Sequence, residues 1–136
     1  MDRKLWISPC CVVLLAIAGG CPFQGLVYEA DMVGGYAVWA TDVIEDAAIV
    51  LKDKHASGGV TVVPAMVSEY GWNNEFIIAK QCPVSHRQAA PSVYWYIIQV
   101  RGAQIHGPLS EGEFHKIRTE LNMPSELSFT RTTRLR

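Results

Sequence analysis

The sequence lacks an excess of charge of either sign and lacks a hydrophobic run long enough to span a bilayer. Its 136 residues carry 12 Lys or Arg against 13 Asp or Glu, and counting from Cys21 the balance is ten against twelve. No basic stripe is present, which argues against nucleic acid as a partner. The apolar stretch at residues 5–18 is interrupted by Ser8 and Pro9, and it falls short of the roughly 20 residues that a transmembrane helix needs.

Catalytic signatures are also missing. The sequence contains no G-x-S-x-G elbow, no glycine-rich phosphate loop and no dinucleotide-binding fingerprint. No close-spaced metal-binding pair occurs among its four histidines, which are His55, His86, His106 and His115. We therefore expect no catalytic residue, no metal and no cofactor. In the alternative, His106 and His115 approach each other and form a metal site, because they flank the turn into a predicted helix where Glu111 and Glu113 lie nearby.

The first 21 residues have the three parts of a bacterial lipoprotein signal. Arg3 and Lys4 form a basic start, an apolar run follows, and the segment ends in Ala18-Gly19-Gly20-Cys21. Small residues before a cysteine resemble the lipobox, in which the cysteine thiol receives a diacylglyceryl group. In the alternative, ordinary signal peptidase cleaves after residues 16–18 and releases a soluble chain. We expect residues 1–20 to be a signal peptide and Cys21 to be lipidated.

Lipidation of Cys21 has consequences for location and for the remaining cysteines. Two or three acyl chains, palmitate among them, hold a polypeptide stably on a bilayer, whereas one chain binds only marginally. The predicted location is the bacterial cell envelope, outside the cytoplasm. Pro22 is not the aspartate that retains lipoproteins in the inner membrane, which favours the outer membrane, facing the periplasm, in a cell with two membranes. Only Cys82 then remains as a free thiol, and its apolar neighbours predict burial.

Alternating and β-branched residues predict mostly strands after residue 35. Residues 36–41 and 47–51 are two short runs joined by a polar turn, as in a hairpin. Residues 62–81 have the pattern of an antiparallel hairpin with its turn at residues 71–74, and Pro64 indicates an edge strand or a bend. Residues 93–100 are apolar on both alternating faces, which is typical of a central strand covered on each side.

One helix is predicted near the C-terminus. Ser110 and Glu113 have the spacing of a capping box, and Leu109 and Phe114 have that of a hydrophobic staple. The apolar stripe of this helix must cover a sheet face. The fold class is therefore α+β, with an antiparallel sheet of about five or six strands, built from hairpins, and one C-terminal helix packed on it.

The predicted organisation has four parts along the chain. They are a signal peptide at 1–20, a lipidated N-terminus and linker at 21–35, a single α+β domain at 36–126 and a basic C-terminal tail at 127–136.

Trp72 and Asn73 are the predicted ligand-binding residues. A tryptophan in a tight polar turn is placed for exposure, and exposed tryptophan is enriched in binding hot spots. In the alternative, the ring folds back over the hairpin and packs against Tyr70 or Phe76. Two further tryptophans are assigned to the core, namely Trp39 and Trp95.

Residues 62–81 and 94–124, together with the lipobox-like start, resemble a family of small bacterial lipoproteins that carry a domain of unknown function. In that family a strand of the type YYWII precedes a turn, a Gly-Pro pair, an acidic capped helix and an exit at proline. Here His106 stands before Gly107-Pro108, where the family more often has tyrosine. The resemblance implies an extracytoplasmic lipoprotein and carries over no functional residue.

Three classes of function fit these features. The first is a membrane-anchored envelope lipoprotein whose non-catalytic domain binds a protein or a cell-wall component, through a sheet edge or the Trp72 hairpin. The second is a small envelope hydrolase that uses His106, His115 and a nearby carboxylate. The third is a small inhibitor or immunity-like protein. The missing nucleophile motif favours the first class.

Overall fold

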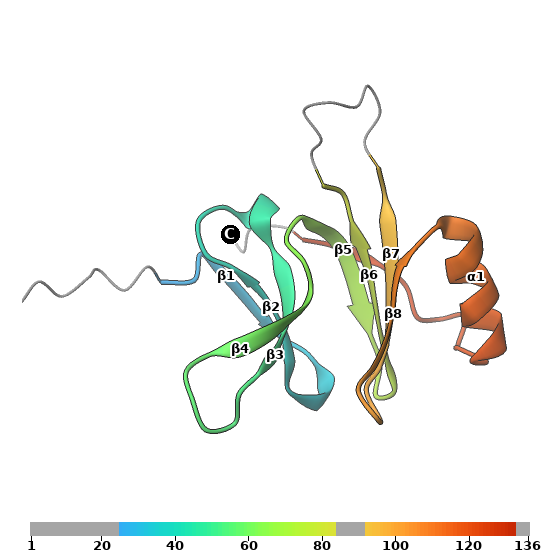
Figure 1. Cartoon of the computed structure of the whole chain (residues 1–136), viewed down its shortest axis with the longest axis horizontal. Coiled ribbons are helices and arrows are strands. Elements are labelled where there is room, and N and C mark those ends of the chain that lie inside the picture. Colours follow the sequence, from blue (N-terminus) through green and yellow to red (C-terminus); the bar gives the residue numbers. More distant parts are fainter. Residues whose placement is uncertain (1–24, 84–91, 133–136) are drawn as a thin grey trace, which may run out of the picture.

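The computed structural model describes residues 25–83 and 92–132. Within them the chain forms three layers, with a sheet A on one side, a sheet B in the middle and a helix outside sheet B (Figure 1). Sheet A has the strand order β1-β2-β3-β4, and sheet B has the order β8-β7-β6-β5-β9. The predicted signal peptide, Cys21 and His86 lie outside the described residues.

Short connections join the elements along the chain. Sheet A consists of β1 (Tyr28–Asp31), β2 (Tyr36–Ala40), β3 (Ala48–Lys52) and β4 (Gly59–Val63), with the 3-10 turns η1 (Val33–Gly35) and η2 (Ile44–Asp46) between them. Sheet B consists of β5 (Val67–Trp72), β6 (Phe76–Gln81), β7 (Tyr94–Gln99), β8 (Gln104–Leu109) and β9 (Thr130–Arg131). The helix α1 (Glu111–Glu120) follows β8.

The predicted α+β class and the antiparallel pairing are confirmed. β2 forms the expected hairpin with β3, and β5 forms the expected hairpin with β6. The strands differ from the prediction in being divided between two sheets of four and five strands, instead of forming one sheet of about five or six.

The division between the sheets arises at residues 64–66, where the chain leaves sheet A and enters sheet B. Pro64 has no N–H to donate to a strand ladder, and Met66 has a left-handed φ of 76° that redirects the backbone. Val67 then donates its N–H to the Ala47 carbonyl at 2.8 Å as β5 begins. The bend expected at Pro64 is thus confirmed, and β4 lies at the edge of sheet A.

Residues of β6 and β7 point alternately into two hydrophobic cores. Ile77 and Ile98 lie in the core between the sheets, whereas Ile78 and Ile97 lie in the core between sheet B and the helix. All four side chains are at most 1% exposed. The prediction of a central strand covered on both faces is therefore confirmed. Trp95 differs from its assignment to the core, because near the start of β7 it is only half-buried at the rim of the second core.

Three hydrogen bonds made by buried side chains hold elements around the first core together. The hydroxyls of Tyr28 in sheet A and Tyr70 in sheet B are 2.6 Å apart and link the two sheets. The Gln81 side chain accepts a hydrogen bond from the Tyr96 hydroxyl at 3.0 Å and donates one to the Ala65 carbonyl at 2.9 Å. These bonds satisfy polar groups that burial would otherwise leave without partners.

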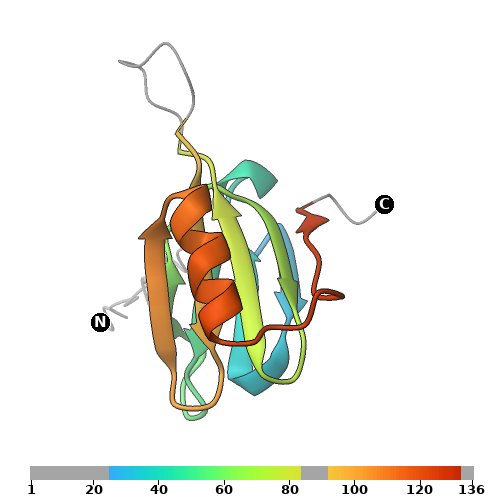
Figure 2. The same cartoon turned by 90° about the vertical axis from the view of Figure 1, so that its right-hand side faces the viewer.

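The helix α1 covers the outer face of sheet B (Figure 2). Its predicted capping box is confirmed, since Ser110 Oγ accepts the Glu113 N–H at 3.3 Å and Glu113 Oε2 accepts the Ser110 N–H at 2.8 Å. Phe114 is fully buried in the second core, and Leu109 packs against the same cluster. Local capping and burial therefore act on the same first turn.

The folded domain extends beyond both boundaries indicated by the sequence. Residues 28–31, expected to be linker, form the edge strand β1 and pair with β2. Leu127 is buried, and β9 pairs with β5, so residues 127–132 belong to the domain and not to a tail. Both segments are ordered by pairing or packing with distant parts of the chain, which their composition does not reveal.

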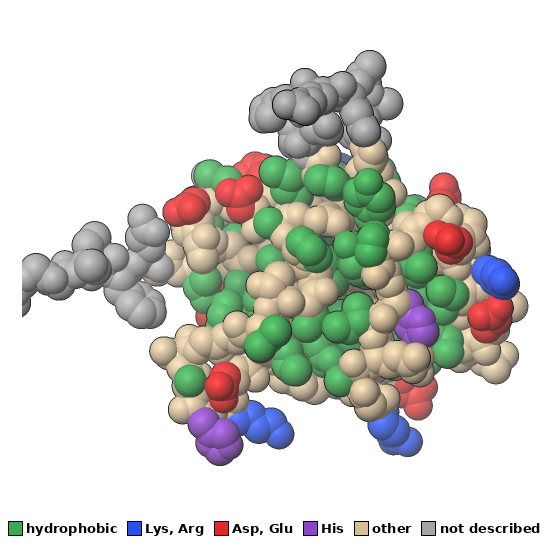
Figure 3. Space-filling model, viewed as in Figure 1, with side chains coloured by type: hydrophobic (Ala, Val, Ile, Leu, Met, Phe, Trp, Pro, Cys, Tyr) green, Lys and Arg blue, Asp and Glu red, His purple; other side chains and the backbone are tan. Residues whose placement is uncertain are grey.

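The face seen in Figure 3 carries hydrophobic side chains across its middle, between the edge strands β4 and β8. Val60 of β4 and Ile105 of β8 have 69% and 42% of their surfaces exposed. β4 and β8 are edge strands of their sheets, so hydrophobic side chains on this side of the sandwich are more exposed than those in its centre.

Replacing Phe114 should destabilise the protein far more than removing the helix cap. We expect Phe114→Ala to cost about 3–5 kcal/mol, because it empties a core position, and Ser110→Ala to cost about 1 kcal/mol, because it removes one capping bond. Denaturant unfolding followed by circular dichroism measures both. Equal small losses would contradict the packing of α1 on sheet B.

The stability should fall at alkaline pH through Tyr70. Burial, followed by the hydrogen bond to Tyr28, raises the pKa of Tyr70 above its ordinary value of 10.0. Above pH 10 the unfolded tyrosine loses its proton while the folded one keeps it, so the free energy of unfolding decreases as the pH rises. Tyr70→Phe should lower the stability at neutral pH but flatten its decline between about pH 9 and 11. Denaturation midpoints across this range provide the measurement, and an unchanged slope in the variant would contradict the assignment.

Candidate functional site

Trp72 and Asn73, the predicted ligand-binding residues, lie at the end of β5 and in the turn that follows it. The Trp72 ring stacks on Tyr70, with ring centroids 5.9 Å apart and planes inclined by 15°, yet 42% of the residue remains exposed. It therefore folds back over the hairpin and stays accessible at the same time. Asn73 Oδ1 accepts the N–H groups of Glu75 and Phe76, both at 2.8 Å, so this oxygen serves the turn.

A hollow of about 320 Å³ lies between this turn and the segment at residues 124–130. The segment crosses β5 closely at Gly71, where a Cβ atom would lie 2.0 Å from the Ser128 carbonyl oxygen. Glycine is therefore required for the backbone approach that forms one wall of the hollow. A binding role for Trp72 and Asn73 stays a prediction.

A second cluster surrounds Lys80 on the outer face of sheet B. Lys80 Nζ lies 2.6 Å from Glu69 Oε2 and 4.5 Å from the ring centroids of both Trp95 and Phe129. Arg131 of β9 approaches the other oxygen of Glu69 at 3.7 Å. Because Glu69 pairs with both cations and two rings enclose Lys80, the cluster holds the C-terminal segment on sheet B. It borders a hollow of about 550 Å³.

The two histidines of the hydrolase alternative, and the thiol of Cys82, have separate partners. His106 Nε2 lies 2.8 Å from Gln99 Nε2, whereas His115 Nε2 lies 3.8 Å from Glu111 Oε1 on the helix. Cys82, predicted to be buried, is half-buried and has its Sγ 3.3 Å from Ser68 Oγ. Across residues 25–83 and 92–132 no group of three His, Cys, Asp or Glu side chains is placed to hold a metal ion. The structure therefore does not join His106 and His115 in one described cluster.

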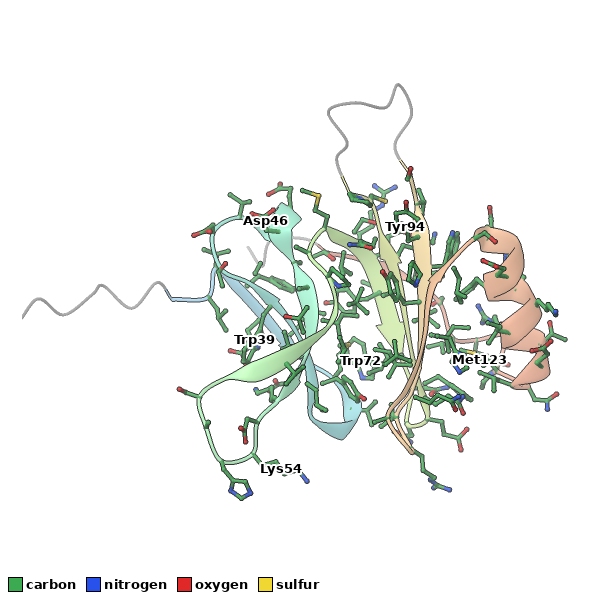
Figure 4. The ribbon with its side chains drawn as sticks, viewed as in Figure 1. Trp39, Asp46, Lys54, Trp72, Tyr94 and Met123 are labelled. Carbon is green, nitrogen blue, oxygen red and sulfur yellow. The ribbon has the colours of Figure 1, made fainter. Side chains whose placement is uncertain are left out.

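The third site lies on the outer face of sheet A and centres on Trp39. Glu29 of β1, Trp39 of β2 and Lys52 of β3 project to the same side, because paired residues of antiparallel strands share a face. The Trp39 Nε1–H donates to Glu29 Oε1 at 3.2 Å. Lys52 Nζ lies 3.0 Å from the same oxygen and 2.7 Å from Asp31 Oδ1. Figure 4 shows Trp39 on sheet A, and Trp72 in a different part of the molecule.

A hollow of about 330 Å³ opens beside these side chains. Its lining combines Trp39, the apolar residues Leu26 and Ala56, and polar groups of the strands and of the β3–β4 loop, namely Glu29, Lys52, Asp53, Ser57 and Gly58. The loop is shaped by hydrogen bonds, because Asp53 Oδ1 accepts the His55 N–H at 2.8 Å and the Gly58 carbonyl accepts the Asp53 N–H at 2.9 Å. We call this cavity with its lining the Trp39 hollow.

The electrostatics of the Trp39 hollow are set by the ion pairs of one lysine. Hydrogen bonds to Asp31 and then to Glu29 raise the pKa of Lys52 above its ordinary value of 10.5. Lys52 therefore stays charged at neutral pH and bridges the two carboxylates of β1. This bridge keeps Glu29 in place as the acceptor for the Trp39 indole.

The sequence prediction assigned Trp39 to the core, and the structure shows this to be wrong. Val38 and Ala40 point into the core between the sheets, whereas Trp39, one position out of phase, is half-buried on the opposite face. The period-two alternation of residues 36–40 is the signal that would have placed Trp39 with Glu29 and Lys52.

A comparison with known protein families assigns the chain to one of them. A family model described as a protein of unknown function, DUF3997, matches residues 33–133. The chain belongs to this family. No curated protein and no protein of solved structure matches it. The DUF3997 match includes β9 but not β1, so it supports the inclusion of residues 127–132 in the domain and adds no activity.

Removing the Lys80 side-chain charge should loosen the C-terminal segment of the DUF3997 domain. We expect Lys80→Met to cost about 1–3 kcal/mol, because Lys80 is half-buried against Glu69 and two rings. The matched control is Lys116→Met, whose exposed pair with Glu120 spans 3.9 Å and should contribute less than about 0.5 kcal/mol. Denaturant unfolding of both variants tests the difference, and similar losses would contradict the role of Lys80.

Proposed function

We propose that this chain is a membrane-anchored lipoprotein of the bacterial envelope, and that its DUF3997 domain is a non-catalytic binding module. Acyl chains on Cys21 would tether it to the bilayer, and the domain would bind a cell-wall component or an envelope protein. In a cell with two membranes, Pro22 favours the outer membrane, with the domain facing the periplasm. The proposal has an anchoring part and a binding part, which rest on different residues.

The anchoring part rests on the sequence that precedes the domain. A basic start, a short apolar run and the exit Ala18-Gly19-Gly20-Cys21 together have the pattern of a lipidation site. The first strand begins at Tyr28, seven residues after Cys21. Seven extended residues span at most about 25 Å, so a lipid on Cys21 would keep the domain close to the membrane surface. Within the described residues no helix has the length and apolar character of a membrane span.

The binding part rests on one observation, the Trp39 hollow. Side chains from three neighbouring strands are fixed there by hydrogen bonds, and the cavity of about 330 Å³ falls in the size range of small-ligand sites. Trp39 lines this cavity from the outer face of the sheet, and tryptophan is among the residues that most often dominate binding energy. The hydrophobic stripe of α1, by contrast, is already used to cover sheet B.

Replacing Cys21 tests the anchoring part. In bacterial cells that express the full chain, we expect the unaltered protein to fractionate with membranes and to incorporate labelled palmitate. Cys21→Ala should abolish the label and leave the chain as an uncleaved precursor or in the soluble fraction, because the acyl acceptor is the cysteine sulfur. Cys82→Ala is the matched control and should keep both label and membrane fractionation.

If the Cys21→Ala chain is processed to begin at Gly19 and still fractionates with membranes without detergent extraction, the lipid anchor is refuted. N-terminal sequencing of the membrane fraction distinguishes that product from the lipidated chain.

A further inference from the structure

We propose that the Trp39 hollow is a saccharide-binding site, with a neutral pyranose ring stacked on the indole and its hydroxyls bound by the surrounding polar groups. This inference rests on the proposed function only in treating the domain as a binding module; it does not depend on the lipid anchor. It names the ligand class of the site from four properties of the hollow, which are its aromatic wall, its polar groups, its charge and its rigidity.

The aromatic wall is supplied by Trp39. A sugar ring has one face made of C–H groups and a rim made of hydroxyls, so it needs a partner that is apolar across a plane and polar around it. The indole offers the broadest apolar plane of any side chain, with a single polar atom. Here that atom, Nε1, is occupied by Glu29 at 3.2 Å, which leaves the ring itself as the contact surface.

The polar groups stand beside this wall. Among the described residues, Glu29 makes both of its contacts, to Trp39 and to Lys52, through Oε1. Its other oxygen, Oε2, is therefore available to accept a hydrogen bond from a ligand hydroxyl. The carboxylate of Asp53 and the hydroxyl of Ser57 line the same cavity from the β3–β4 loop. A few fixed polar groups on a largely apolar wall are the usual basis of orientation in small-ligand sites.

The charge of the hollow selects among saccharides. The lining of the hollow contains two carboxylates, those of Glu29 and Asp53, and one ammonium group, that of Lys52. Lys52 is already paired with Glu29 and with Asp31 of the same strand. An acidic sugar would meet excess negative charge, and among the described lining residues the one cation, Lys52, is already paired. A neutral sugar adds no further negative charge and can donate its hydroxyls to these carboxylates, which favours neutral pyranoses over uronates or sugar phosphates.

The rigidity of the site reduces the cost of binding. Ala37 and Val50, which pair with each other on the outer face of β2 and β3, are buried, at 0% and 5% exposure. Trp39 thus lies on a packed surface and is held by Glu29, so less side-chain freedom is lost when a ligand binds. The cavity of about 330 Å³ suits a short saccharide more than a folded protein partner.

A titration with defined oligosaccharides tests the proposal on the full chain in detergent micelles. The probes are a tetramer of N-acetylglucosamine, a tetramer of glucose and, as the acidic control, a tetramer of galacturonate. We expect a neutral tetramer to shift the indole N–H resonance of Trp39, and the acidic tetramer to leave it unchanged. A preference for the N-acetylglucosamine tetramer supports a cell-wall glycan as the source, and a preference for the glucose tetramer supports a polysaccharide without amino sugars.

Matched variants locate the site. Trp39→Ala should weaken binding at least about tenfold, because it removes the stacking surface. Trp39→Phe keeps an aromatic ring and should retain part of the affinity, which separates loss of the site from loss of folding. Trp72→Ala removes an exposed tryptophan from a different part of the described domain and should change the affinity less than about twofold. Cys21→Ala should bind as the unaltered chain does, so failure of the anchor and failure of the saccharide site give different results.

Three results would overturn the proposal. The first is that neither neutral tetramer shifts the Trp39 resonance. The second is that binding persists in Trp39→Ala and disappears in Trp72→Ala, which would move the site to the β5–β6 turn. The third is that the galacturonate tetramer binds as tightly as the neutral ones, because the carboxylates of the hollow would then have no effect on selection.

Discussion

Burial of both faces of β6 and β7 is the interaction on which the rest of the structure depends. Their side chains alternate between two cores, and the isoleucines at positions 77, 78, 97 and 98 are at most 1% exposed. Burying each such side chain contributes about 1.5–3 kcal/mol, which is available only if both faces are covered. Sheet A covers one face, and α1 with the C-terminal segment covers the other. The bend at residues 64–66 lets sheet A pack on one face of sheet B. The C-terminal segment at residues 127–132 runs back to pair with β5 and helps to cover the other face.

This arrangement leaves the two outer layers unequal. The outer face of sheet B is hidden beneath α1 and residues 123–129, whereas no helix of the described chain covers the outer face of sheet A. Some side chains on that face, unlike the buried Ala37 and Val50, remain accessible to solvent. Glu29, Trp39 and Lys52 occupy it, and their mutual hydrogen bonds define a polar and aromatic surface beside a cavity. The candidate site therefore lies on the outer face of sheet A because no helix of the described chain packs against that face.

Features that depend on neighbours in sequence could be predicted, and features that depend on distant partners could not. The capping box at Ser110, the hairpin turn at Asn73 and the two-sided strand at residues 94–99 each follow from a few adjacent residues. The division into two sheets and the incorporation of β1 and β9 require knowledge of which strands pair across the domain. For the site, the polar turn after Trp72 indicated that its ring could be exposed or could pack on Tyr70, and the structure shows both features. Trp39 was assigned to the core because a large aromatic residue in a short apolar run usually packs inward. The alternation of Trp39 with Val38 and Ala40 indicates instead that Trp39 points away from the core.

The buried Gln81 side chain has a consequence for the alignment of the strands. When a strand is apolar on both faces, sliding it by one residue against its neighbour exchanges one set of hydrophobic side chains for another, so hydrophobicity alone opposes the slip weakly. Gln81 on β6 is 8% exposed and binds both Tyr96 on β7 and the Ala65 carbonyl before β5. A slip of one residue would turn the Tyr96 hydroxyl to the other face and leave the amide buried without its partner. The buried Gln81 side chain thus favours one registration of β6 against β7 and fixes β6 to the segment that leads into β5.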